Sequence, residues 1–216
     1  MAETLETILA DGVIAIVRSD SAAGLIQTVR ALAAGGLRAI EVTMTTPGAL
    51  EAIRAAAGEC GGDYIIGAGS VLDGESARLS ILAGAEFLVM PTVSLDAVAV
   101  AKRYGKVACP GALTPTEIVR AWEAGADIVK VFPASVSGPG YIRALAGPLP
   151  QVRTMPVGGV NLANTPAYIE AGACAVGVGG ALVNRKTIAA GDWPQITETA
   201  RQYVQAVAAA RAAAGR

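Results

Sequence analysis

The sequence contains no histidine, and this absence removes several kinds of catalytic site. Without imidazole the chain cannot form a Ser-His or Cys-His nucleophile, use a histidine general base or bind zinc through histidine. Any catalysis must therefore depend on lysine, carboxylates, tyrosine, cysteine, backbone amides or a bound cofactor.

Cysteine is scarce as well. The three cysteines are odd in number and far apart in the chain, at Cys60, Cys109 and Cys174. This spacing matches neither a disulfide framework nor a metal-binding knuckle. We therefore expect no metal site, and a reducing compartment, the cytoplasm.

Charge is sparse and balanced. Charged residues make up 16% of the chain, and 17 basic against 18 acidic residues leave a net charge of -1. This balance provides no electrostatic attraction for nucleic acid or for an anionic membrane. The chain also lacks an uninterrupted apolar run of membrane-spanning length, and its first residues are acidic rather than basic. We expect neither a secretion signal nor a transmembrane helix.

Apolar sequence is abundant: 53% of the 216 residues are hydrophobic, which predicts a single domain over residues 1–216 with a full core. A short unit recurs along this domain. In each copy a helix-like stretch reaches an Ala-Gly pair and an apolar run follows, with the pairs beginning at Ala34, Ala83, Ala124 and Ala171. Glycine there accepts the left-handed conformation that ends a helix. Each unit therefore predicts a helix, a tight turn and a strand.

Apolar runs without alternation indicate strands buried on both faces, as in a parallel sheet. Such runs occupy Val13–Val17, Ala39–Thr43, Tyr64–Ala68, Phe87–Met90, Val107–Cys109, Ile128–Phe132, Thr154–Pro156 and Ala175–Val178. Ala-rich amphipathic stretches lie between them, including Ser21–Ala34, Pro47–Ala57, Ser76–Ala83, Thr116–Ala124 and Asn164–Ala171. About eight such alternations predict an α/β fold, a compact (β/α)8 TIM barrel. The alternative is a doubly wound open sheet, but Arg18-Ser19-Asp20 follows the first strand where a dinucleotide fold has a glycine-rich turn.

A lysine interrupts one of the buried runs. By period-two alternation Lys130 shares a strand face with Ile128 and Phe132, and Val129 and Val131 take the other face. We assign the Lys130 face to the barrel interior, because the outer face must pack against helices. Burial lowers the pKa of a lysine, and a desolvated amine attacks carbonyl carbon well. We therefore predict that Lys130 is a Schiff-base nucleophile; the alternative is a structurally paired lysine.

A carboxylate lies in another buried run. Glu41 and Thr43 share one face of Ala39–Thr43, and the same alternation turns both toward the interior. Thr43 is therefore a candidate substrate-binding residue. Glu41 is predicted to act as a general acid–base, with an interior ion pair as the alternative.

Further candidates follow the ends of predicted strands, where barrel enzymes have their active sites. Gly158-Gly159 and Gly179-Gly180 are expected to bind phosphate through backbone N–H groups, although tight turns use such pairs too. Ser70 is predicted to bind a substrate carboxylate or carbonyl, or else to cap the next helix. Arg18 is predicted to bind a carboxylate or phosphate, with a surface salt bridge as the alternative.

Six motifs occur in order along nearly the whole chain: Glu41-Val42-Thr43, GAGSVL at 67–72, PGALTPTE at 110–117, KVFPA at 130–134, PVGGV at 156–160 and GVGGALV at 177–183. Together they resemble the KDPG/KHG family of class I aldolases. The resemblance implies a trimeric (β/α)8 barrel without a metal or other cofactor. It also implies that Lys130 forms the Schiff base, Glu41 transfers protons, Ser70 binds substrate and Phe132 lines the pocket.

Three positions depart from the pattern of many family members. Thr45 stands where an arginine contacts substrate, Val157 replaces a threonine and Gly180 replaces a serine. We keep Thr45 as a candidate substrate-binding residue and consider Arg18 as the replacement cation. Backbone amides of the late glycines still provide a way to hold a phosphate.

The function that the resemblance implies is reversible cleavage of a 2-keto-3-deoxy sugar acid, of the 6-phosphogluconate type or a related 4-hydroxy-2-oxo acid. The products would be pyruvate and an aldehyde such as glyceraldehyde 3-phosphate. A 6-phosphogalactonate-type or unphosphorylated substrate is an alternative. Two other classes stay open: a non-catalytic barrel that binds phosphorylated metabolites, and another phosphate-binding barrel enzyme such as an isomerase. The expected partners are small keto acids, aldehydes and two further copies of the chain.

Overall fold

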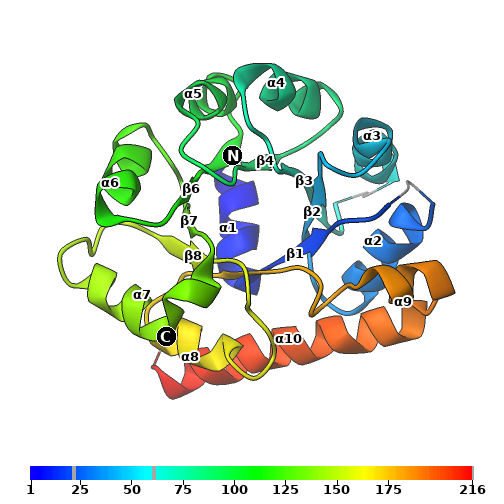
Figure 1. Ribbon diagram of the computed structural model, residues 1–216. Helices are drawn as coiled ribbons and strands as arrows, with labels where there is room; N and C mark the ends of the chain where they lie inside the picture. Colours follow the sequence, from blue (N-terminus) through cyan, green and yellow to red (C-terminus); the bar gives the residue numbers. More distant parts are fainter. Residues whose placement is uncertain (21–22, 60–61, 216) are drawn as a thin grey trace.

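The computed structural model describes residues 1–20, 23–59 and 62–215, in which strands and helices alternate (Figure 1). The strands are β1 Val13–Val17, β2 Ala39–Thr43, β3 Ile65–Gly69, β4 Phe87–Val89, β5 Val107–Cys109, β6 Gly111–Ala112, β7 Val129–Val131, β8 Thr154–Pro156 and β9 Val176–Val178. The helices are α1 Ala2–Asp11, α2 Leu25–Ala34, α3 Ala49–Glu59, α4 Gly74–Leu82, α5 Leu95–Arg103, α6 Pro115–Glu123, α7 Gly138–Ala146, α8 Thr165–Glu170, α9 Arg185–Ala190 and α10 Trp193–Ala213. Each apolar run named above overlaps one of these strands.

The strands form two sheets in which the neighbouring strands run parallel. One sheet has six strands in the order β5-β4-β3-β2-β1-β9, and the other has the order β6-β7-β8. A parallel bridge between Val157 and Gly177 joins the end of β8 to β9. The predicted α/β class and the predicted parallel strands are therefore confirmed.

Side chains on the two faces of the strands pack into separate apolar clusters. The inner cluster includes Ile128, together with Ile8 of α1, while Val129 and Val131 belong to the outer cluster beneath the helices. In the view of Figure 1, α1 appears at the centre, with the strands around it and the other helices farther out. The alternation predicted for this strand is confirmed, because the face that Lys130 shares with Ile128 is the inner one.

The recurring Ala-Gly units end helices as the sequence predicts. In three of the four pairs the glycine has positive φ: 110° at Gly84, 97° at Gly125 and 108° at Gly172. The prediction is wrong for the first pair, because Gly35 is right-handed with φ of -82° and the following Gly36 has the positive φ instead. After Gly84, the N–H of Ala85 donates to the carbonyl of Ser80 at 3.0 Å, which closes the helix end and turns the chain into β4. The same turn therefore aims several strands into the sheet.

The 21-residue helix α10 packs against α2 and α8 along one side of the molecule (Figure 1). Near its end, Arg211 donates to the carbonyls of Leu9, Ala10 and Cys174.

Cys60 and the first two residues of the predicted helix 21–34 lie outside the described residues. Cys109 and Cys174 are free thiols. In the part of the chain that the structure describes, no helix has the length and apolar character needed to cross a membrane.

Candidate active site

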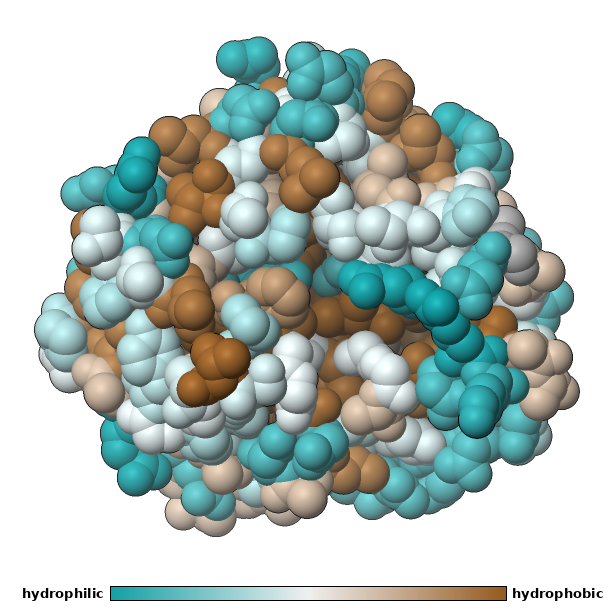
Figure 2. Space-filling view, in the orientation of Figure 1, coloured by the Kyte–Doolittle hydropathy of each residue, from teal (hydrophilic) through white to brown (hydrophobic). Residues whose placement is uncertain are grey.

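A cavity of about 650 Å³ opens at the carboxyl ends of the strands. Figure 2 shows it as a hollow with an apolar floor and hydrophilic side chains on the side of α9. Its lining consists of Ile16, Arg18, Glu41, Ser70, Pro91, Lys130, Phe132, Val157, Gly179, Gly180, Val183, Asn184, Arg185 and Lys186. The volume suits a small metabolite, and this end of a parallel sheet is where ligands commonly bind.

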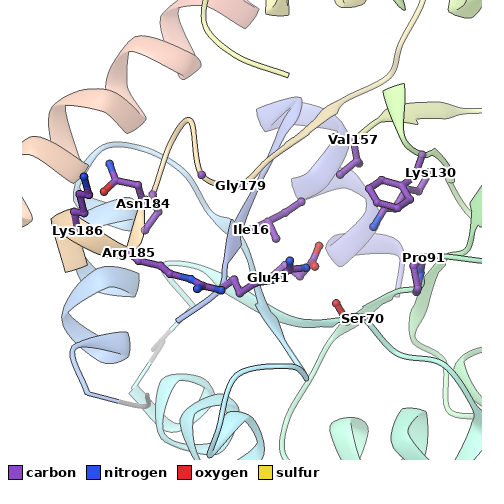
Figure 3. A pocket seen from close by; sticks show the side chains of 14 residues that line it. Ile16, Glu41, Ser70, Pro91, Lys130, Val157, Gly179, Asn184, Arg185 and Lys186 are labelled. Atoms are coloured by element: carbon purple, nitrogen blue, oxygen red, sulfur yellow. The ribbon is translucent and has the colours of Figure 1, made fainter. Parts of the chain in front are cut away.

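Lys130 projects into this cavity from β7 (Figure 3). Only 6% of the residue is exposed, and its Nζ atom lies 4.6 Å from the centroid of the Phe132 ring. Burial lowers the pKa of the Lys130 amine, Glu41 partly opposes this effect and Arg18 adds to it. The neutral, nucleophilic amine is therefore more populated than on an exposed lysine.

Glu41 enters the same cavity from β2 (Figure 3). Burial raises the pKa of its carboxyl group from 4.5 to about 7, although Lys130 and Arg18 pull it downward. Within the described residues, the buried Oε2 atom has no hydrogen-bond partner. A carboxyl group with this pKa can both accept and return a proton near neutral pH.

Two glycines of β3 make room for neighbouring side chains, and one of these is the Glu41 carboxyl group. A Cβ atom on Gly69 would overlap the Glu41 carboxylate, and one on Gly67 would overlap the Phe87 ring. From the sequence, Gly67 and Gly69 were named only as part of the motif GAGSVL, without a packing role. Their signal was available, since glycine inside an apolar strand often marks a close approach by another group.

Ser70 follows β3 and lines the cavity with φ of 58°, a left-handed conformation that is uncommon outside glycine. The alternative that Ser70 caps the next helix is wrong. Asp73 is the N-cap of α4, and its side chain accepts the Ser76 N–H at 2.7 Å. The Ser70 hydroxyl is thus not committed to that helix end.

Arg18 stands just after β1, at the edge of the cavity. Among the described residues, Arg18 has no carboxylate within ion-pair distance. Its positive charge nevertheless acts to lower the pKa of both Glu41 and Lys130. The predicted alternative, a surface salt bridge of Arg18, is therefore not formed within the described part of the chain.

The structure brings some of the other predicted residues to the cavity but not all of them. Phe132, Gly179 and Gly180 line it, whereas Thr43, Thr45, Gly158 and Gly159 lie outside the lining. The Thr43 hydroxyl is instead within 3.1 Å of the Thr45 hydroxyl and 3.3 Å of the Thr46 hydroxyl. Gly158 lies behind the Phe132 ring, which a Cβ atom there would contact.

Sequence reasoning missed the polar run Asn184-Arg185-Lys186, which contributes to the cavity from the start of α9. The Asn184 side chain caps α9 by accepting the Thr187 N–H at 2.9 Å. The available signal was a cap residue followed by two cations, shortly after the Gly179-Gly180 pair. A helix of six residues, such as α9, is too short for its periodicity to be found in the sequence.

The chain matches the family model described as "KDPG and KHG aldolase" over residues 5–199. It is 39% identical to the 2-dehydro-3-deoxy-phosphogluconate aldolase of Treponema pallidum (strain Nichols), over 95% of this chain and 96% of that protein. It is 35% identical to the 2-dehydro-3-deoxy-6-phosphogalactonate aldolase of Escherichia coli (strain K12), over 77% and 82% of the two chains. Among solved structures, KDPG aldolase from Legionella pneumophila, with pyruvate captured at low pH as a covalent carbinolamine intermediate, superposes with a TM-score of 0.83 at 27% identity. That superposition covers 92% of this chain and 96% of the other.

Proposed function

Because the chain belongs to the KDPG and KHG aldolase family, we propose that Lys130 and Glu41 perform a class I aldol cleavage in the cavity described above. The protein is a carbon–carbon lyase that splits a keto acid into pyruvate and an aldehyde through a Schiff base. One observation carries the residue assignment: a buried amine with a lowered pKa shares a cavity with a carboxyl group whose pKa is about 7.

In the first step the neutral Nζ of Lys130 attacks the C2 ketone of a 2-keto-4-hydroxy acid. The new N–C2 bond forms a carbinolamine. Its hydroxyl group, the former ketone oxygen, takes up one proton from solvent and leaves as water, which gives an iminium ion; the final hydrolysis returns that proton. The iminium nitrogen attracts electrons from the adjacent carbon chain, so it supplies the electron sink that the next step requires.

In the second step Glu41 accepts the proton of the C4 hydroxyl. The C3–C4 bond breaks, its electron pair flows toward the iminium to form an enamine, and the aldehyde leaves. Glu41 then returns a proton to C3, and water hydrolyses the iminium to release pyruvate and free Lys130. A group with a pKa near 7 suits this exchange, because it gains and loses a proton with little cost at neutral pH.

The remaining lining residues bind the substrate in this proposal. Arg18 and the Ser70 hydroxyl hold the keto acid carboxylate, Phe132 covers the reacting carbons, and the backbone of Gly179 and Gly180 faces the distal half of the molecule. The substrate is a 2-keto-3-deoxy sugar acid of the 6-phosphogluconate or 6-phosphogalactonate type. The two relatives named above support these two types equally.

We also propose that the two sheets close into one eight-stranded barrel, in which β5 and β6 count as a single strand, and that residues 1–216 form one domain. Hydrogen bonds support closure on both sides of the second sheet. The Asp127 N–H donates to the Ala108 carbonyl at 3.0 Å on one side, and the bridge between Val157 and Gly177 lies on the other.

We further propose that the protein is a homotrimer. Exposed leucines gather on the neighbouring helices α4 and α5 and just before them, at Leu72, Leu79, Leu82 and Leu95. Figure 2 shows apolar residues among hydrophilic ones along this edge of the molecule. An exposed apolar surface of this kind usually marks an interface. Sedimentation velocity of the full chain should give a single species of three times the chain mass, and a monomer would contradict the proposal.

The direct test of the catalytic proposal is reduction with borohydride in the presence of pyruvate. We expect the intact mass to increase by one reduced pyruvyl group, and peptide mapping to place that group on Lys130. An adduct on another lysine, or a folded protein without any adduct, would contradict the assignment.

A further inference from the structure

The cavity carries more positive charge than the bond-breaking chemistry uses. Among its described lining residues, the cations are Arg18, Lys130, Arg185 and Lys186, and the carboxylate is Glu41. A 2-keto acid brings one carboxylate to the reacting end, and Arg18 is available for it. The cations of α9 are therefore left without a task in the cleavage itself.

Arg185 and Lys186 differ in direction although they are adjacent in sequence. In Figure 3 the Arg185 side chain runs from α9 toward the cavity, whereas the Lys186 side chain points away from it. Lys130 lies on the opposite side of the cavity from α9 in the same view. A substrate attached to Lys130 would therefore extend its far end toward Arg185.

We propose that Arg185 binds a second anionic group, a phosphate or a carboxylate, on the aldehyde half of the substrate. This inference rests on the function proposed above and makes Arg185 a specificity-determining residue of the same site. A guanidinium group suits this task because its planar set of donors matches the oxygens of phosphate and carboxylate alike.

The surroundings of Arg185 position its guanidinium group and leave several of its N–H donors available for a ligand. Its Nη1 atom lies 3.0 Å from Oδ1 of Asp20, and both side chains are more than half exposed. An exposed ion pair of this kind contributes little free energy, so an incoming anion can share or replace it. The remaining N–H groups of the guanidinium stay available as donors. Asn184 caps α9 directly before Arg185 and so fixes where the side chain starts.

The chain also lacks other side chains for this task at the positions where the family resemblance would place them. Val157 and Gly180 line the cavity but carry no polar side chain, and Thr45 lies outside the lining. Backbone amides of the Gly179-Gly180 segment can contact a phosphate, but they provide no net charge. Arg185 is the described lining residue that is both cationic and directed at the far end.

The test compares three substrates with Arg185→Gln. These are 2-keto-3-deoxy-6-phosphogluconate with a phosphate tail, 4-hydroxy-2-oxoglutarate with a carboxylate tail, and 2-keto-3-deoxygluconate with a neutral tail. For at least one charged tail we expect kcat/KM to fall roughly 10- to 100-fold, the range for losing a charge-assisted hydrogen bond, with a change under about 3-fold for the neutral tail. The tail that loses more identifies the anion. Equal losses on all three substrates would overturn the inference.

A charge-matched control separates contact from long-range field. Arg120→Gln removes one positive charge from the exposed face of α6 and should leave the ratios among the three substrates unchanged. Arg185→Lys should restore only part of the charged-tail activity, because an ammonium group keeps the charge but loses the planar fork. Full loss of charged-tail preference in Arg120→Gln would mean that net charge, rather than Arg185, governs selectivity.

Two further readouts distinguish failure of this inference from failure of the proposed function. Pyruvate trapping on Lys130 should be as efficient in Arg185→Gln as in the wild type, because pyruvate does not reach α9. Calorimetric titration with glycerol 3-phosphate should show binding that weakens at least 10-fold in Arg185→Gln. Weakened binding without any pyruvate adduct would support the anion site and refute the aldolase assignment of Lys130. A normal adduct with unchanged binding and unchanged substrate ratios would refute the anion site alone.

Discussion

Lys130→Met is expected to abolish pyruvate release and to eliminate the borohydride-trapped pyruvyl adduct. In the mechanism above the amine makes the covalent bond, and no other lysine among the described lining residues points at the Glu41 carboxyl group. Loss of a covalent nucleophile removes the whole iminium pathway, so we expect turnover to fall by at least about 10³-fold. A coupled assay that oxidises NADH as pyruvate is reduced would measure it.

The fold should survive this substitution. Methionine is apolar and similar in length to lysine. It removes the free-energy cost of burying the charged Lys130 amine, a cost that applies at pH values below the pKa of that amine. Because the folded-state pKa of Lys130 is lowered from 10.5, wild-type stability should rise as pH increases through that folded pKa toward 10.5. Lys130→Met should lack this dependence. Near pH 6, where Glu41 is mostly protonated, it should melt at or above the wild-type temperature.

Lys106→Met is the matched control. Lys106 directly precedes β5, at the amino end of the strand and away from the cavity, and its Nζ atom forms an ion pair with Glu86 at 2.6 Å. We expect this variant to keep both turnover and the adduct. A Lys130→Met protein that still released pyruvate would refute the mechanism, and an unfolded one would show that the lysine is structural.

The sequence predicted the inner face of the strands better than it predicted the loops. Uninterrupted apolar runs and the Ala-Gly turns are local patterns, so the strands and several helix ends could be found from them. Alternation then placed Lys130 and Glu41 on the inner face. Alternation says nothing about which side chains a strand end exchanges with the loop that follows. Thr43, the last residue of β2, was predicted at the cavity from that alternation and Thr45 from the family resemblance, but the Thr43 hydroxyl instead contacts the hydroxyls of Thr45 and Thr46.

The residues that the sequence analysis missed depend on contacts between distant segments. Gly69 matters because a side chain there would occupy the space of Glu41, on the neighbouring strand. Arg185 matters because α9 begins beside the loop after β1, as its contact with Asp20 shows. Both relations join residues more than 25 positions apart. Periodicity within one segment cannot reveal them.

Glu41→Gln is expected to lower kcat by roughly 10²- to 10⁴-fold, the usual contribution of a general acid–base. The amide keeps the size of the side chain but cannot accept the C4 proton. Imine formation at Lys130 should remain detectable by trapping, because the amine is intact. Unchanged kcat with a normal pH profile would show that Glu41 is only a structural partner of Lys130.

The pH profile gives the most specific signature of this residue. Glu41 must be ionised to act as a base, so wild-type kcat/KM should fall as pH drops below about 7. Glu41→Gln should lose this limb. The limb that remains belongs to Lys130 and should move to lower pH, because the Glu41 charge that raised the lysine pKa is gone.

Unfolding experiments test the same carboxyl group without any substrate. Its pKa is 4.5 in a free side chain and about 7 in the folded protein, so the folded state binds this proton more tightly. The contribution of Glu41 to stability should therefore be largest below pH 4.5 and should decline as pH rises through 7, by at most about 3 kcal/mol. Glu41→Gln does not titrate. Its stability relative to the wild type, measured by urea unfolding, should thus increase over that interval, and a constant difference would mean that Glu41 is not buried as an acid.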